Sequence, residues 1–442
     1  MLTKIKKQIR PFVPQCFVDL KRVIVKRMQM RKTKIQMKQS QSRHPIILDK
    51  LRRKDRVKVV FFVRHCAIWK YDRVFQLMLK NSRFDPIIVI CPHIYFGEDI
   101  MMQGLKLTAQ FMQEKKYPYV ITLDFETGKW LDVKEEIKPD IIFFTNPYEA
   151  ATKKEYFIFN FPDSLTCYVP YNFGNCHMLD MFHNEPFHNS LWRLFAETDI
   201  HKQFSIDVAL NKGINVITTG FPGTDIFIDK NYIPKNPWNK NKKQLKKIIW
   251  APHHTIDEDK SFLSFSSFLV YADDILELTE KYKDYVQFAF KPHPLLKAKL
   301  YSYTGWNKER TDKYYNAWNN MENGQIEEGN YEDLFLTSDA MIHDCGSFSI
   351  EYLYVGKPVL RTDRDDSITD RMNKFGIMAY SVHYHARTKD DIETFVKNVI
   401  EGKDEKKNER EQFKQKYLLP PNNKSASQNI IDEICKHVCY NN

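Results

Sequence analysis

Short apolar runs alternate with longer amphipathic stretches along the first half of the chain. The strand-sized runs cover residues 58–63, 87–91, 119–122, 141–145 and, more weakly, 166–170. Helix-like sequence at 70–80 and 98–116 lies between some of these runs. Apolar runs without alternation are typical of strands buried on both faces. The pattern therefore predicts a parallel sheet with helices on both sides.

A second series of the same kind follows residues 229–247, which are polar, lysine-rich and contain proline, as interdomain linkers tend to be. Its predicted strands cover 247–251, 285–290, 340–342 and a segment from 359, and its predicted helices cover 265–283 and 348–355. Two α/β series joined by a linker predict two Rossmann-like domains that face each other across a cleft.

The expected organisation has five segments. They are a basic N-terminal arm (1–55), a first Rossmann-like domain for the acceptor (56–228), the linker (229–247), a second Rossmann-like domain for a nucleotide-activated donor (248–424), and a last helix (425–442) that we expect to cross back. No apolar run approaches the roughly 20 residues of a membrane span, and no signal-peptide pattern is present. We therefore expect a cytoplasmic protein.

Positive charge is concentrated in the arm. The chain has a formal net charge of +11, yet residues 1–56 hold 18 Lys and Arg against 3 Asp and Glu, and the remainder carries a net charge of −4. Apolar residues are interleaved at Ile5, Ile9, Phe12, Phe17, Leu20, Val23, Val25 and Met28. This pattern favours a basic amphipathic helix on the anionic inner face of the cell membrane. A solvated helix packed on its own domain and a nucleic-acid-binding arm are the alternatives, and the acidic body makes nucleic acid the weaker one.

The cysteines give no sign of a metal or disulfide framework. All eight are spread singly, without a CxxC pair. Cys435, His437 and Cys439 lie close together, but a frayed terminal helix explains them better than a metal site. We therefore predict that the protein needs no metal and no cofactor.

Two histidine-containing segments follow predicted strands of the second series. Pro252, His253, His254 and Thr255 come directly after the strand at 247–251, where ligands bind in open parallel sheets. Adjacent histidines can donate to phosphate or move a proton near neutral pH, although an ordinary surface loop would also contain them.

The second segment, Lys291 to Pro294, places His293 between two prolines that restrict the backbone. Lys291 adds a charge suited to a phosphate. A rigid turn in which His293 only caps a helix is the alternative.

A third segment reads as strand, small-residue turn and helix. Asp344 ends the strand, Gly346 permits close backbone approach, and Ser347 and Ser349 add hydroxyl donors. Backbone N–H groups at such a turn suit a pyrophosphate, and Glu351 is placed to bind ribose hydroxyls. Ordinary helix capping by Ser347 is the alternative.

Together the three segments resemble the CDP-glycerol glycerophosphotransferase family, which has a GT-B fold. The matching residues are Ala251–Thr255, Lys291–Pro294, Ser338–Asp339, Asp344–Ser347 and Glu351. The resemblance is clear over 220–400 and looser in the first domain. It implies an α/β, GT-B type transferase of cell-surface polymer synthesis, with a CDP-activated donor and a lipid-linked or polymeric acceptor.

Some family elements are changed. The family's Trp-His-Gly-Thr-Pro element, whose histidine is thought to act as base, is missing, and residues 168–175 stand near its place with His177 just beyond. His65, after the first strand, is another candidate base. Gly223 stands where the family often has Arg or Lys.

The resemblance implies that an acceptor hydroxyl attacks the β-phosphate of a CDP-alditol and that CMP leaves. The predicted catalytic residues are His254, His293 and His65. The predicted donor-binding residues are Pro252, His253, Thr255, Lys291, Asp344, Gly346, Ser347, Ser349 and Glu351. A glycosyltransferase of the same fold, a UDP-sugar 2-epimerase and a non-enzymatic nucleic-acid-binding or scaffold protein are the alternatives.

Overall fold

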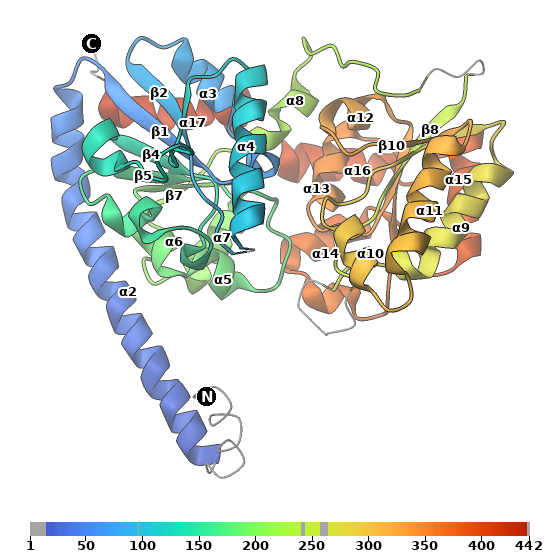
Figure 1. Cartoon of the computed structure of the whole chain (residues 1–442), viewed down its shortest axis with the longest axis horizontal. Helices are drawn as coiled ribbons and strands as arrows, with labels where there is room; N and C mark the ends of the chain where they lie inside the picture. The colour runs from blue at the N-terminus through green and yellow to red at the C-terminus, as the bar shows by residue number, and fades with distance from the viewer. Residues whose placement is uncertain (1–14, 96, 240–243, 257–263, 440–442) are drawn as a thin grey trace.

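Two parallel sheets, each enclosed by helices, form the body of the protein in this computed structural model (Figure 1). The structure describes residues 15–95, 97–239, 244–256 and 264–439, with the side chains of the first helix from residue 27 onward. The prediction of two Rossmann-like domains is confirmed.

The first sheet has the strand order β3-β2-β1-β4-β5-β6-β7. Its strands are β1 (Val57–Val63), β2 (Phe84–Ile90), β3 (Tyr119–Ile121), β4 (Ile141–Phe144), β5 (Leu165–Tyr168), β6 (Arg193–Ala196) and β7 (Val216–Thr218). Helices cover both faces, and β1 is almost entirely buried, which explains its unbroken apolar sequence. In the parallel register Val63 lies beside Ile90, and Phe62 lies beside Phe144.

Amphipathic helices cover this sheet. They are α3 (Asp72–Leu79), α4 (Glu98–Glu114), α5 (Leu179–His183), α6 (Pro186–Ser190), α7 (Asp199–Val208) and α8 (Asp225–Ile228). The buried residues of α4 include Met101, Leu105, Ala109 and Met112, which share one helical face. The 3.6-residue period therefore fixes which side of α4 meets the sheet.

The second sheet has the order β10-β9-β8-β11-β12-β13. Its strands are β8 (Lys246–Ala251), β9 (Val286–Phe290), β10 (Gly324–Ile326), β11 (Ala340–His343), β12 (Val359–Thr362) and β13 (Tyr384–Ala386). The helices of this half are α9 (Phe268–Lys281), α10 (Leu296–Ser302), α11 (Asn307–Asn320), α12 (Glu332–Thr337), α13 (Phe348–Glu351), α14 (Lys374–Ser381), α15 (Lys389–Glu401) and α16 (Lys407–Phe413).

Apolar packing joins the two domains. Phe173 of the first domain stacks on Phe375 of the second, with ring centroids 5.7 Å apart, and Phe227 stacks on Phe335 at 5.9 Å. All four side chains belong to one continuous hydrophobic cluster. Part of the space between the domains is therefore filled by side chains.

The first and last described helices pack together on the first domain. Helix α2 (Gln15–Arg52) buries Ile47 and Leu51 there, while its N-terminal end extends away from the body (Figure 1). Helix α17 (Ala426–Val438), red in Figure 1, packs against α2 and α3. Its first N–H groups, of Ala426 and Ser427, donate to Asp225.

The predicted amphipathic face of the arm falls largely outside the described part. Ile5, Ile9 and Phe12 lie outside the described residues, as do the side chains of Phe17, Leu20, Val23 and Val25, whereas Met28 is described and exposed. Among the described residues, no helix has the length and apolar character that crossing a bilayer requires.

Candidate active site

The site lies at the switch point of the second sheet, where the order in which strands are added changes direction. From β8 the chain builds the sheet outward through β9 and β10, and then returns to place β11 on the other side of β8. Ala251, the last residue of β8, lies beside His343 of β11. The strand order changes direction at this point, and open α/β sheets bind ligands in the crevice at such a switch point.

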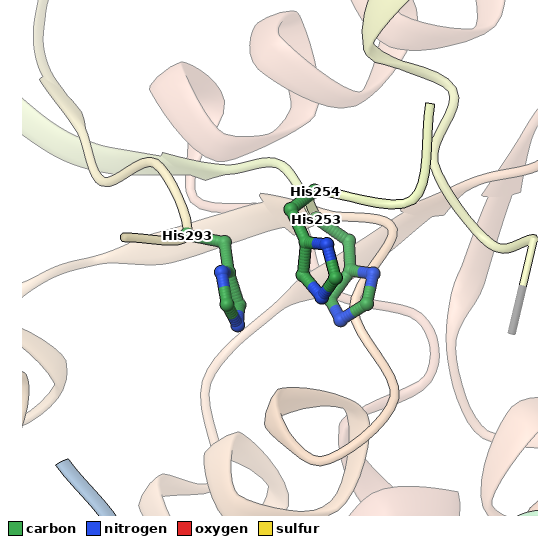
Figure 2. A group of neighbouring side chains, drawn as sticks. All are labelled: His253, His254 and His293. Carbon is green, nitrogen blue, oxygen red and sulfur yellow. The ribbon is translucent and has the colours of Figure 1, made fainter. Parts of the chain in front are cut away.

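Three imidazole rings gather at this crevice, and Figure 2 shows them hanging on the same side of the chain. The ring centroid of His254 lies 4.4 Å from that of His253 and 4.2 Å from that of His293, and those of His253 and His293 are 5.1 Å apart. The structure therefore brings the adjacent His253 and His254 together with His293, which lies 39 positions beyond His254 on a second loop.

Backbone hydrogen bonds hold the rings in place. The N–H of His293 donates to the carbonyl of Pro252 over 3.1 Å and ties the two loops together. Nδ1 of His293 accepts from the N–H of Leu295 at 3.1 Å. Nδ1 of His253 lies 2.9 Å from the hydroxyl of Thr255, which also accepts from the N–H of Phe265. Pro252 and Thr255 thus orient the rings.

Burial keeps two of the rings neutral. It lowers the pKa of His293 to about 3 and the pKa of His253 well below its usual value, and the neighbouring His254 adds to both shifts. Because Nδ1 of His293 accepts a hydrogen bond, the proton of the neutral ring sits on Nε2. His293 therefore presents an N–H donor, and an anion is its natural partner.

The same rings could also hold a metal ion. One nitrogen from each of His253, His254 and His293 lies within 4.8 Å of the others. Imidazole ligands without a carboxylate suit zinc-like ions rather than magnesium. Ligation through Nε2 of His293 would require its proton to move to Nδ1, against the N–H of Leu295. The tautomer inferred from the hydrogen bond to Leu295 therefore favours an anion, and metal independence stays a prediction.

The carboxylate of Asp344 accepts hydrogen bonds from the loop after β8, which carries His253 and His254. Its fully buried carboxylate accepts from the N–H groups of His253 and Ser267 and from the hydroxyls of Ser266 and Ser267. Burial raises its pKa to about 6. Donor binding was predicted for Asp344, and its contacts indicate that it acts by positioning His253.

The turn after β11 lies beside the histidines. Phe265 bridges them, since its ring centroid is 6.1 Å from that of His253 and its Cε2 is 3.8 Å from an ideal Cβ on Gly346. Ser349 donates to the carbonyl of Gly346, and the side chain of Ser347 makes no capping bond to α13. Because α13 has only four residues, its dipole is smaller than the sequence suggested.

Lys291 and Glu351 are held by protein partners. The ammonium of Lys291 donates to the carbonyls of Glu327 (3.1 Å) and Gly329 (2.7 Å), and burial lowers its pKa. Tyr331 donates to the buried carboxylate of Glu351. Their predicted contacts with phosphate and ribose therefore require these partners to be exchanged, and they stay predictions.

Loops of the first domain reach this site. Lys70 donates to the hydroxyl of Tyr331 at 2.8 Å, and its ammonium is 3.8 Å from the carboxylate of Glu351. Gly223 makes room for it, because a Cβ there would lie 3.0 Å from Cδ of Lys70. Lys70 therefore places a cation beside Gly223, the position at which the family often carries Arg or Lys.

Asn175 forms a second interdomain contact. Its amide donates to the carbonyl of Gly346 at 2.8 Å and to the hydroxyl of Ser349 at 3.3 Å. Its own carbonyl accepts from the N–H of Asn373. The sequence analysis missed Lys70 and Asn175, because only the fold shows that loops after β1 and β5 face the loop after β11.

His65 follows β1 in the first domain, apart from the three-histidine cluster. Its Nδ1 accepts from the N–H of Ala67 at 3.1 Å, and burial lowers its pKa. The neutral ring therefore carries its proton on Nε2, as His293 does. This geometry suits a hydrogen-bond donor better than the base that the sequence analysis predicted.

A hollow of about 410 Å³ lies elsewhere, between α2 and the first sheet, with Leu48, Arg52 and Trp192 among its lining residues. It contains none of the predicted site residues. Convergent polar groups at the crevice, rather than the size of a cavity, identify the candidate site.

A family model for the CDP-glycerol:poly(glycerophosphate) glycerophosphotransferases matches residues 202–436, more than half of the chain. The chain belongs to this glycerophosphotransferase family. The resemblance predicted from the three segments is thereby confirmed. No curated protein sequence matches the chain.

Solved structures share the fold of this family member. A variant of the wall teichoic acid polymerase TagF aligns with a TM-score of 0.57 and 14% identity, over 99% of this chain and 98% of that one. The UDP-GlcNAc 2-epimerase from Neisseria meningitidis bound to UDP-GlcNAc aligns with a TM-score of 0.53 and 16% identity, over 86% of this chain and 100% of that one. A putative epimerase from Listeria monocytogenes gives 0.53 and 15% identity, over 86% and 96%. At such identities these likenesses establish the GT-B type fold of the glycerophosphotransferase-family chain.

Proposed function

We propose that the protein transfers a glycerol-phosphate or related alditol-phosphate unit from a CDP-activated donor to a polymeric or lipid-linked acceptor in cell-surface polymer synthesis. The observation that carries the proposal is the cluster of His253, His254 and His293 at the switch point of the second sheet. Family membership and the teichoic acid polymerase among the similar folds support the same reaction class.

In the proposed reaction the acceptor hydroxyl oxygen forms a bond to the β-phosphorus of the donor. The bond from that phosphorus to the bridging oxygen breaks, and CMP leaves with this oxygen. Nε2–H of His293 and backbone N–H groups near Gly346 and Ser347 stabilise the charge on the phosphoryl oxygens, the main resource in phosphoryl transfer. His254 accepts the hydroxyl proton.

Donor binding gives the first test. A nucleotide that binds the folded state raises the melting temperature. At a nucleotide concentration of 100 times Kd, binding adds about 2.7 kcal/mol to the free energy of unfolding. We expect CDP-glycerol to raise it more than UDP-sugars or GDP-sugars do, and CMP release to require an acceptor. A shift with a UDP-sugar and none with any cytidine nucleotide would contradict the proposal and favour a glycosyltransferase or an epimerase.

The basic arm is proposed to hold the enzyme on an anionic membrane surface. Arg31, Lys34 and Lys38 are exposed on α2, and their spacing places them near one helical face. The triple variant Arg31→Glu, Lys34→Glu, Lys38→Glu should lose flotation with vesicles containing phosphatidylglycerol while it keeps the shift with CDP-glycerol. Undiminished flotation of this variant would remove the arm from the proposal.

A further inference from the structure

Arg64 is a buried cation at the carboxyl end of β1. Only 4% of the residue is exposed. Its Nη1 donates to the side-chain oxygen of Asn146 at 2.7 Å and to the carbonyl of Tyr148 at 2.9 Å, whereas its buried Nη2 has no protein partner. The guanidinium is therefore held in one orientation with part of its donor capacity unused.

Arg64 also lacks a counter-ion. Two other arginines are buried as deeply, and each is paired: Arg361 lies 3.4 Å from Asp363, and Arg410 pairs with Asp404. Within the described part of the chain, no acidic side chain forms an ion pair with Arg64. Burial lowers its pKa to about 10, so the group stays charged at neutral pH. An unpaired buried charge is costly unless a ligand supplies the opposite charge.

The position of Arg64 is that of a ligand-binding residue. The strand order of the first sheet changes direction between β1 and β4. Arg64 follows β1, and Asn146 and Tyr148 follow β4. This is the switch point of the first sheet, equivalent to the site of the three histidines in the second. Crevices of this kind are where open α/β sheets bind ligands.

The neighbours of Arg64 add donors rather than negative charge. His65 offers Nε2–H, and the hydroxyl of Tyr148 lies 3.3 Å from that of Tyr171, so the pair shares one proton and can donate the other. His93 follows β2, directly beside the end of β1; burial lowers its pKa, and Arg64 and His65 add to the shift. His65, Tyr148 and Tyr171 are half-buried, so they form the reachable surface above the arginine.

We propose that Arg64, His65 and Tyr148 form an anion site that binds a phosphate group of the acceptor. The role of the anion as acceptor rests on the proposed function, whereas anion binding itself rests on the unpaired arginine and its place at the switch point. The acceptor is accordingly an alditol phosphate, or a chain whose terminal alditol carries a phosphate and a free hydroxyl, and an uncharged glycan does not fit the site.

The test measures binding of sn-glycerol 3-phosphate to the full-length protein by calorimetry, with glycerol and inorganic phosphate as comparison ligands. We expect Arg64→Gln to weaken the binding of glycerol 3-phosphate at least tenfold and to leave unchanged the shift in melting temperature that CDP-glycerol causes. Arg56→Gln is the matched control, because Arg56 lies at the opposite end of β1 and is exposed. His293→Ala should bind glycerol 3-phosphate as the wild type does, which separates this site from the donor site.

Equal binding by Arg64→Gln and the wild type, no binding by the wild type, or an equal loss in Arg56→Gln would overturn the anion site. Tyr148→Phe, which keeps the ring, should weaken binding about threefold and serves if Arg64→Gln does not fold; unchanged binding there would also count against the site. Arg64-dependent binding of glycerol 3-phosphate without any binding of CDP-glycerol would support the anion site and contradict the proposed function.

Discussion

The two sheets carry different charges at the same topological position, the switch point at which the strand order changes direction. At the switch point of the second sheet lie His253 and His293, which burial keeps neutral, above the buried carboxylate of Asp344. At the switch point of the first sheet lies Arg64, a buried cation without a counter-ion among the described residues. One fold thus supplies directed N–H donors in one domain and fixed positive charge in the other. The location of a site follows from topology, whereas its chemistry follows from the few residues after each strand.

The largest expected effect comes from removing a donor at the second switch point. His293→Ala should lower the rate of CDP-glycerol-dependent transfer about 100- to 1,000-fold, because a positioned donor to the developing negative charge is lost. The measurement is CMP release in the presence of acceptor.

His44→Ala provides the control for this variant. His44 lies on α2, far from both switch points, and burial lowers its pKa to about 4, so it is also neutral at pH 7. We expect its activity to stay within twofold of the wild type. Full activity in His293→Ala would remove this histidine from the catalytic assignment.

A second prediction concerns the carboxylate below the histidines. Asp344→Asn should lower the free energy of unfolding by about 3 kcal/mol, because an amide cannot accept all the hydrogen bonds that now converge on the buried carboxylate. Urea denaturation measures the loss. Asp339→Asn, at the other end of β11, keeps an amide oxygen that can accept from the N–H of Lys247 and should cost at most about 1 kcal/mol. Equal losses in the two variants would contradict the special role of Asp344.

The neutral state of His293 predicts how stability changes with pH. Its pKa is about 3 in the folded protein against about 6.5 for an unperturbed histidine, so between these values the unfolded chain binds more protons and acid destabilises the fold. Between pH 7 and pH 5, the free energy of unfolding should therefore fall by up to about 2 kcal/mol less in His293→Gln than in the wild type. Asp344, with its pKa raised to about 6, acts in the opposite direction once the pH falls to about 6 and below. Identical pH profiles of melting temperature would show that His293 is not held neutral by burial.

The smallest expected effect is that of metal removal. Dialysis against EDTA should leave transfer activity within twofold, because the tautomer of His293 favours an anion over a cation. Colorimetric or mass-spectrometric metal analysis accompanies the assay. Loss of activity on dialysis that added zinc restores would replace the anion site by a metal site.

Much of the fold follows from the apolar pattern alone. The buried run from Val57 to Val63 predicts β1, and the last helix was expected at 425–439 and is observed at Ala426–Val438. Three-residue strands such as β7 and β10 are too short for a periodic signal. Helix α11 was missed because Thr311, Tyr314, Tyr315 and Trp318, rather than aliphatic residues, form its buried face.

The site was predictable where its residues cluster in sequence. His253, His254 and His293 stood out because they follow strands and are flanked by prolines. The side-chain contacts of Lys291 could not be foreseen, since they depend on carbonyl groups 36 and 38 positions away. Arg64 had a usable signal, a cation directly after a buried apolar strand, but only the fold shows that it has no ion-pair partner among the described residues.

The return of α17 to the first domain restricts how the two halves can move. The chain passes between them twice, through the segment before β8 and through the segment before α17. Two such crossings define an axis, and relative rotation about that axis is the motion that breaks the fewest covalent and packing constraints. Such a rotation would separate Asn175 from Gly346 and Lys70 from Tyr331 together. Release of both contacts would thus be coupled to a single hinge opening.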